Sequence, residues 1–150
     1  MKSIFNTEAC QEILDRFENI SQGHQAIWGE MNVSQMLKHC QKPIKLAFGE
    51  EEVTKPNLLM RLMIKFIKPT LYNEKPWKQG LPTAKEFVVR DNIDFEIEKV
   101  ELKKLIKRMR ESESYFTPSK KHPIFGNMKS WMWGQSVYKH LDHHLQQFGA

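Results

Sequence analysis

Histidines gather near the end of the chain, where His140, His143 and His144 lie within five residues of one another. His140 and His144 are four residues apart, so a helix places both imidazoles on one face, from which they can point at one metal ion. Zinc-binding helices with an HxxxH pattern use the same geometry. Two imidazoles supply only half of a metal site, so the pattern calls for a further ligand from another part of the chain.

His39 is our candidate for that ligand, because it accompanies the apolar stripe of a predicted helix. In helical bundles, metal sites are built from inward-pointing side chains on facing helices. Three neutral histidines leave coordination positions open for water or substrate, and they suit zinc, nickel or ferrous iron. The alternative is that His39 is an ordinary core residue and that the HxxxH spacing arose by chance.

Neighbouring side chains of the last segment are candidates for supporting the site or lining a pocket. His143 points about 100° away from His140 on a helix. We expect it at the surface or behind the ligands, although it could act as a ligand together with His140 or Gln147. Tyr138 and Trp133 could line a pocket, but aromatic residues at helical spacing more often belong to the core. No general acid or base can be assigned from the sequence.

The hydrophobic pattern predicts the elements that position these residues. It indicates four or five helical stretches, over residues 8–20, 32–48, 57–67, 92–112 and 129–148, separated by irregular connections over 69–90 and 113–127. Thr7 and Asn32 are the expected N-caps of the first two helices, and Pro43 predicts a kink or a break in the second. Because we find no convincing pair of strands, the pattern favours an all-α fold built as a helical bundle.

The segment 57–67 combines a narrow basic face, formed by Arg61, Lys65 and the following Lys68, with apolar residues on every other side. A helix lying on a membrane surface has this composition. A helix buried on three sides with one solvated stripe has it too. We expect the buried arrangement.

Length and composition place the chain among ordinary globular domains. It has 150 residues, of which 40% are hydrophobic and 27% charged. This fits one domain over residues 1–150 and excludes a chain that is disordered throughout. No apolar run is long enough to predict a transmembrane helix, and the first residues lack the apolar stretch of a secretory signal. We therefore expect a cytoplasmic protein.

The cysteines and the distribution of charge indicate the redox compartment and the class of binding partner. The cysteines, Cys10 and Cys40, match no metal or redox spacing, and we expect both to be buried and reduced. The net charge of +5 is concentrated in residues 54–90, which carry eight basic and two acidic side chains. This excess lacks dense Lys/Arg clusters, so we interpret it as solvated surface and expect neither a nucleic acid nor a membrane as partner.

The C-terminal stretch HPIFGNMKSWMWGQSVYKHLDHHLQQF, residues 122–148, resembles the closing motif of the DinB-like superfamily. It looks like a branch of small bacterial proteins known only as a domain of unknown function. WGEMNVSQMLKHC (28–40) resembles the histidine segment of that family's second helix, and LPTAKEFVVRD (81–91) resembles its middle connection.

This resemblance implies a DinB/YfiT-like four-helix bundle in up-down-down-up order, with a long crossover between helices two and three. It also implies a three-histidine site for a divalent metal ion. Carried onto this sequence, the ligands are His39, His140 and His144, and Gln147 matches a glutamine that often follows. Relatives are expected to cap the last helix with Ser or Thr near position 129. Here that position is Lys129, so we expect Asn127 or Ser130 to act as the cap.

The resemblance implies a metal-dependent enzyme of the thiol-dependent transferase or hydrolase type. Its partner would be a low-molecular-weight thiol or another small-molecule substrate. The alternative is a non-catalytic bundle that binds metal or interacts with another protein. A homodimer formed through helix faces is compatible with either function.

Overall fold

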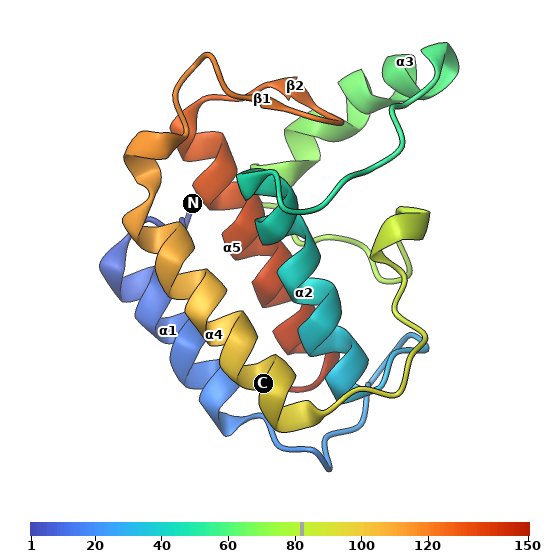
Figure 1. Ribbon diagram of the computed structural model, residues 1–150, viewed down its shortest axis with the longest axis vertical. Helices are drawn as coiled ribbons and strands as arrows, with labels where there is room; N and C mark the ends of the chain where they lie inside the picture. The colour runs from blue at the N-terminus through green and yellow to red at the C-terminus, as the bar shows by residue number, and fades with distance from the viewer. Residues whose placement is uncertain (82) are drawn as a thin grey trace.

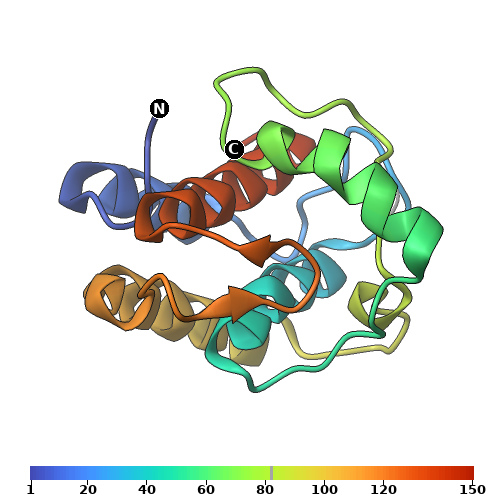
Figure 2. The same ribbon diagram turned by 90° about the horizontal axis from the view of Figure 1, so that it is seen from above.

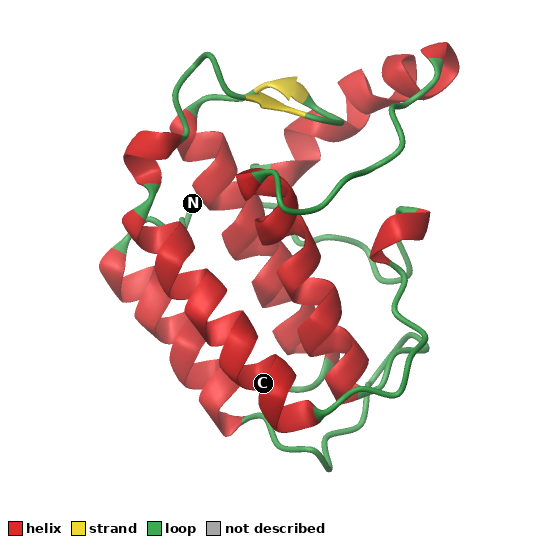
Figure 3. Cartoon of the chain, in the orientation of Figure 1, coloured by secondary structure: helices red, strands yellow, loops and turns green. Residues whose placement is uncertain are grey.

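Four long helices form the body of the protein in the computed structural model, which describes residues 1–81 and 83–150. They are α1 (Thr7–Asn19), α2 (Val33–Phe48), α4 (Phe95–Glu111) and α5 (Ser130–Gln147). A shorter helix, α3 (Leu58–Ile67), and the 3-10 turns η1 (Lys68–Leu71) and η2 (Lys85–Phe87) lie between α2 and α4. The prediction of a mainly helical chain is confirmed (Figure 3).

The long helices pack side by side, and each contacts two of the others. α2 lies against α4 and α5, and α1 lies against the same two helices. In Figure 1, α1 and α5 run downward whereas α2 and α4 run upward. Apolar side chains from all four helices form one buried cluster between them. The α2–α5 contact matters most for function, because these two helices carry the predicted ligands.

Local signals set the ends of the first two helices. Asn6, one residue before the predicted cap Thr7, accepts a hydrogen bond from the backbone of Ala9, so α1 spans Thr7–Asn19. Asn32 caps α2 as predicted and forms a reciprocal capping box with Gln35. Pro43 does not break α2, which continues to Phe48. This position lacks one backbone donor, yet packing against α4 and α5 holds the helix together.

The start of α5 differs from the sequence prediction. Lys129 occupies the N-cap position, and no side chain caps the helix, so the proposed caps Asn127 and Ser130 are wrong. The connection before it contains a small antiparallel hairpin that the pattern did not indicate, formed by β1 (Lys121–His122) and β2 (Gly126–Asn127). Two-residue strands are too short to show the alternation by which strands are recognised.

The expectation that residues 57–67 form a helix buried on three sides is wrong in one respect. The helix forms, capped by Asn57, but within α3 only Ile64 is buried. Figures 1 and 2 show α3 at the outside of the molecule, beyond the long helices.

The long connection between α3 and α4 runs across α5. The Lys139 ammonium donates hydrogen bonds to the carbonyl oxygens of Thr70 and Asn73, at 2.6 and 3.0 Å. The indole of Trp77 donates to the Thr70 carbonyl at 2.9 Å. Pro82, which belongs to the predicted connection and to the 81–91 motif, lies outside the described residues. Among the helices of the described part, none has both the length and the apolar character required to cross a membrane.

Candidate metal centre

The structure brings His39 of α2 together with His140 and His144 of α5. One ligand-capable nitrogen of each ring lies within 4.8 Å of those of the other two. The Nε2 atoms of His39 and His140 are 3.1 Å apart. His39 and His144 are buried, whereas His140 is partly exposed. One turn of α5 and one position of α2 thus bring three imidazoles together at one place.

Two of the three rings are held in place by hydrogen bonds from the nitrogen that faces away from the cluster. Nδ1 of His39 donates to the carbonyl oxygen of Phe87 at 3.0 Å, and Nδ1 of His144 donates to Oε1 of Gln147 at 2.8 Å. Because a proton on Nδ1 leaves the Nε2 lone pair free, both rings are fixed in the tautomer that binds metal through Nε2. Oxygen acceptors of this kind commonly orient histidine ligands.

Gln147 is itself held by the loop between α1 and α2. Its Nε2 donates to the carbonyl oxygen of Trp28 at 2.6 Å, which fixes the amide so that the oxygen faces His144. The neighbouring Gly29 has φ +84°, and a Cβ there would lie 2.5 Å from Nε2 of Gln147. The close approach of the loop to Gln147 therefore requires glycine at this position.

The surroundings keep the three imidazoles neutral. Burial lowers the pKa of His39, although the Phe87 carbonyl partly opposes this shift. Burial and the neighbouring His144 and His39 lower the pKa of His140 well below its usual range, and burial lowers the pKa of His144 to about 3. Neutral imidazole is the form that binds a metal ion. Within the described part of the chain, the cluster consists of histidines alone, a donor set that suits zinc, nickel or ferrous iron.

Aromatic side chains from distant segments surround the cluster. Trp77, from the connection after α3, lies edge-on to His140 at 5.9 Å between ring centroids, and Phe87 lies edge-on to His39 at 6.4 Å. His143 is half-buried between Trp77 and Trp28, with ring centroids at 5.6 and 5.9 Å. The connection and the loop thus form apolar walls beside the three rings.

Comparison with protein-family models matches residues 2–150 to a family described as a protein of unknown function (DUF1569). The chain belongs to this family. No curated protein and no solved structure matches it. The family description states no activity, so the chemistry of this DUF1569 protein has to be argued from its own residues.

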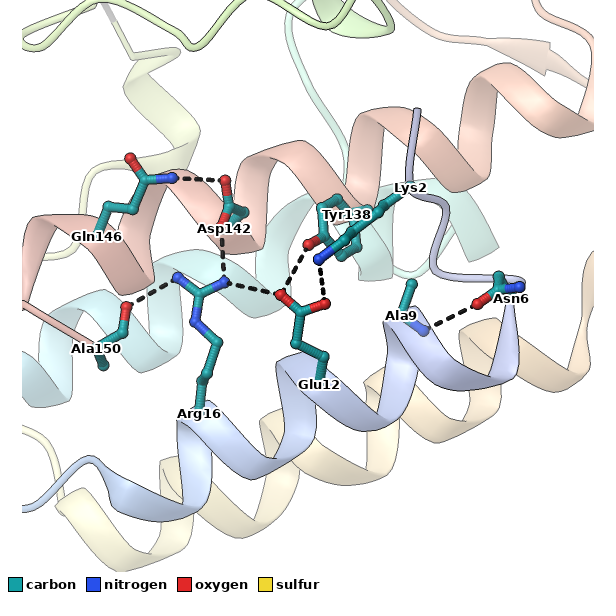
Figure 4. A network of polar contacts seen from close by, with 9 residues as sticks. All are labelled: Lys2, Asn6, Ala9, Glu12, Arg16, Tyr138, Asp142, Gln146 and Ala150. Carbon is teal, nitrogen blue, oxygen red and sulfur yellow. Dashed lines mark hydrogen bonds and ion pairs between the residues drawn. The ribbon is translucent and has the colours of Figure 1, made fainter.

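The other candidates of the DUF1569 chain lie at different distances from the cluster. Gln147 contacts His144 directly, and His143 borders it without joining it. Tyr138 faces α1, where its hydroxyl donates to Glu12 at 3.3 Å (Figure 4). Trp133 is fully buried, and its ring packs against Phe116 and His122. For Tyr138 and Trp133, these contacts are those of core and helix-packing residues.

Sequence reasoning missed the residues that surround the three histidines of this DUF1569 chain. Trp28 and Trp77 lie outside the helices, where no periodicity indicates what a side chain contacts. Phe87 acts through its backbone carbonyl, and a backbone group carries no residue-type signal. The one available hint was that Trp28 and Phe87 fall within segments that resemble the DinB-like family.

Proposed function

We propose that this DUF1569 protein is a metal-dependent enzyme of the DinB-like type, with His39, His140 and His144 as ligands of one divalent ion. The observation that carries the proposal is the convergence of three neutral imidazoles, two of which have their Nδ1 atoms engaged by oxygen acceptors. A histidine that only fills the core does not need to place its ring nitrogens next to those of two other histidines. The match over residues 2–150 supports a single domain.

The helix arrangement supports the DinB-like assignment. α1 and α5 run in one direction and α2 and α4 in the other, which corresponds to up-down-down-up order (Figure 1). The connection that contains α3 corresponds to the long crossover between the second and third long helices. Cys10 and Cys40 are both buried and unpaired, which fits a reducing compartment such as the cytoplasm.

When bound, a divalent ion would supply a Lewis acid that lowers the pKa of a thiol or a water molecule toward neutrality. The residues of the chain perform the remaining tasks. Phe87 and Gln147 keep the imidazoles of His39 and His144 in the binding tautomer. Trp77 and Trp28 flank His143 and would restrict the access of water on this side of the cluster. We propose a low-molecular-weight thiol or another small molecule as the substrate of a transferase or hydrolase reaction.

The ligand set is tested by elemental analysis of the full, untagged chain after chelation and reloading with zinc, nickel or ferrous salts. We expect about one ion per chain in the wild type. His39→Ala, His140→Ala and His144→Ala should each abolish stable binding, and His143→Ala is the matched control that should retain it. Equal metal content in all four variants, or none in the wild type, would reject the site.

A second measurement separates an enzyme from a protein that merely binds metal. Cobalt(II) replaces many divalent ions and reports its ligands through its absorption spectrum. We expect a low-molecular-weight thiol to change the spectrum of the cobalt-loaded chain, because three protein ligands leave a position open. An unchanged spectrum would favour the alternative, a non-catalytic metal-binding or protein-interaction bundle.

A further inference from the structure

Helix α3 exposes a large apolar face that no described part of the protein covers. Leu59 and Phe66 are 69% and 83% exposed, and three more side chains of α3 share the same side. These are Leu58, Leu62 and Met63. Ile64, on the opposite side, is the residue of this helix that is buried. The exposed face thus points away from the protein.

Helical geometry makes this face continuous. At about 100° per residue, Leu58, Leu62, Phe66, Leu59 and Met63 follow one another across an arc of about 140°. The centre of this arc lies about 180° from Ile64. Arg61 and Lys65 project along one flank of the arc, and both side chains are exposed. The helix therefore has an apolar outer face with a cationic edge.

Contacts on the inner side fix the direction of this face. The Lys68 ammonium donates to the carbonyl oxygens of Phe125, at 2.9 Å, and of Asn127. The next turn is held through Thr70, whose carbonyl oxygen accepts from Lys139. These two lysines tie the C-terminal end of α3 to the β1–β2 hairpin and to α5. The apolar face therefore cannot turn inward without breaking both anchors.

The charged side chains of α3 and its immediate flanks are all basic, whereas Glu52 and Glu74 border this stretch and the Glu86 carboxylate accepts hydrogen bonds from Thr54. Residues 53–73 contain four basic side chains and no acidic one. Lys55, Arg61 and Lys65 are exposed, so they are available to an anionic partner. Apolar side chains that enter the acyl boundary, flanked by cations at headgroup level, are the features of an interfacial helix.

We propose that α3 docks the protein on an anionic lipid surface, with Leu59 and Phe66 inserted and Arg61 and Lys65 at the phosphate groups. The expectation of no membrane partner had two grounds, the burial of this helix and the lack of dense Lys/Arg clusters, and the exposure of α3 removes the first. A second copy of the chain fits the face less well. A helix of 10 residues is about 15 Å long, short for the roughly 800 Å² that each partner of a stable dimer buries. Pairing two such faces would also bring like charges together.

The experiment is co-sedimentation of the full chain with vesicles of phosphatidylglycerol and phosphatidylcholine in equal amounts, and with vesicles of phosphatidylcholine alone. We expect binding to the anionic vesicles and much weaker binding to the neutral ones. Leu59→Gln/Phe66→Gln should weaken binding at least about tenfold, because each side chain loses its transfer into the acyl region. Glutamine keeps the helix propensity, and both positions are exposed, so the fold should persist.

A matched control uses another pair of exposed apolar residues on a helix. Ile97, which is 66% exposed, and Val100 lie on α4. Ile97→Gln/Val100→Gln should bind vesicles as the wild type does. Arg61→Gln and Lys65→Gln should each weaken binding about fivefold on anionic vesicles and leave binding to neutral vesicles unchanged.

Three results would overturn the proposal. The first is no binding to either kind of vesicle. The second is equal weakening by the α3 and α4 double variants, which would show that the α3 face is not the contact. The third is a wild-type dimer, detected by analytical ultracentrifugation, that ignores vesicles and dissociates in Leu59→Gln/Phe66→Gln. That result would assign the face to a second copy of the chain.

Discussion

Gln147 accepts a hydrogen bond from Nδ1 of His144 at 2.8 Å. The same amide donates to the Trp28 carbonyl at 2.6 Å, so the loop between α1 and α2 sets the orientation of a ligand on α5. A ring held in this way is already in the rotamer and the tautomer that direct Nε2 toward the metal position.

Gln147→Ala should therefore weaken metal affinity by about 10- to 100-fold, because the His144 ring loses its orienting acceptor. The measurement is a competition titration with a chelator of known affinity. Gln146→Ala is the control, since the Gln146 side chain is exposed and bonds to Asp142 instead. Unchanged affinity in Gln147→Ala would show that the packing of α5 alone orients His144.

Trp77→Ala should release the metal several-fold faster to a chelator, while the amount bound at equilibrium changes little. Trp77 lies beside His140 and His143 but offers no ligand atom, so it should affect access rather than coordination. Stopped-flow mixing of the loaded protein with a chromophoric chelator measures the rate. Trp131→Ala serves as the control, because this exposed indole on α5 packs on Tyr72. Equal release rates in both variants would contradict a covering role for Trp77.

His122 should make the fold sensitive to acid. Its Nδ1 accepts from the backbone of Ile124 and Phe125, and burial, with a smaller effect of Lys68, lowers its pKa from 6.5 to about 3. His122 is therefore protonated near pH 6.5 in the unfolded chain, but only near pH 3 in the folded chain. The free energy of unfolding is unaffected above pH 6.5 and falls as the pH drops through this window.

His122→Asn should flatten that decline by about 1.4 kcal/mol per pH unit, since an asparagine amide oxygen can accept the same bonds without titrating. Urea denaturation of the metal-free chain at several pH values gives the slope. The three clustered histidines contribute in both proteins, so the difference between them isolates His122. Identical slopes would mean that His122 titrates alike in the folded and unfolded states.

We expect Asp142 to contribute to the stability of the fold and not to metal binding. Its carboxylate pairs with Arg16 of α1 at 2.6 Å (Figure 4). Arg16 also donates to the carbonyl oxygen of Ala150 at 2.8 Å, so this partly exposed pair ties α1 to the end of α5. Asp142→Asn should lower the free energy of unfolding by about 0.5–1 kcal/mol, less at high salt.

Urea denaturation at low and high salt measures this effect, and elemental analysis should find unchanged metal content. The control is Asp15→Asn, because Asp15 is exposed and accepts a hydrogen bond from Gln11 on its own helix. A loss of metal in Asp142→Asn would place this carboxylate in the site after all.

Much of the site followed from local pattern. The four-residue spacing of His140 and His144 needs only a helix to place both rings on one face, and α5 is that helix. His39 was a weaker inference, since its neighbours show that it is near the core without showing what lies opposite. Resemblance to the DinB-like family supplied that partner, and the α2–α5 contact places the rings together.

By itself the sequence determined the helices, the Asn32 cap of α2 and the faces on which the histidines lie, because these depend on neighbours within a few turns. Only the tertiary structure decided which face is covered and by what. It left the apolar side of α3 exposed, turned Tyr138 toward Glu12, and brought Trp28 and Trp77 to the histidines. Periodicity indicates that a helix face is apolar. Which segment covers that face depends on contacts between parts of the chain that are far apart in sequence, and local spacing carries no information about them.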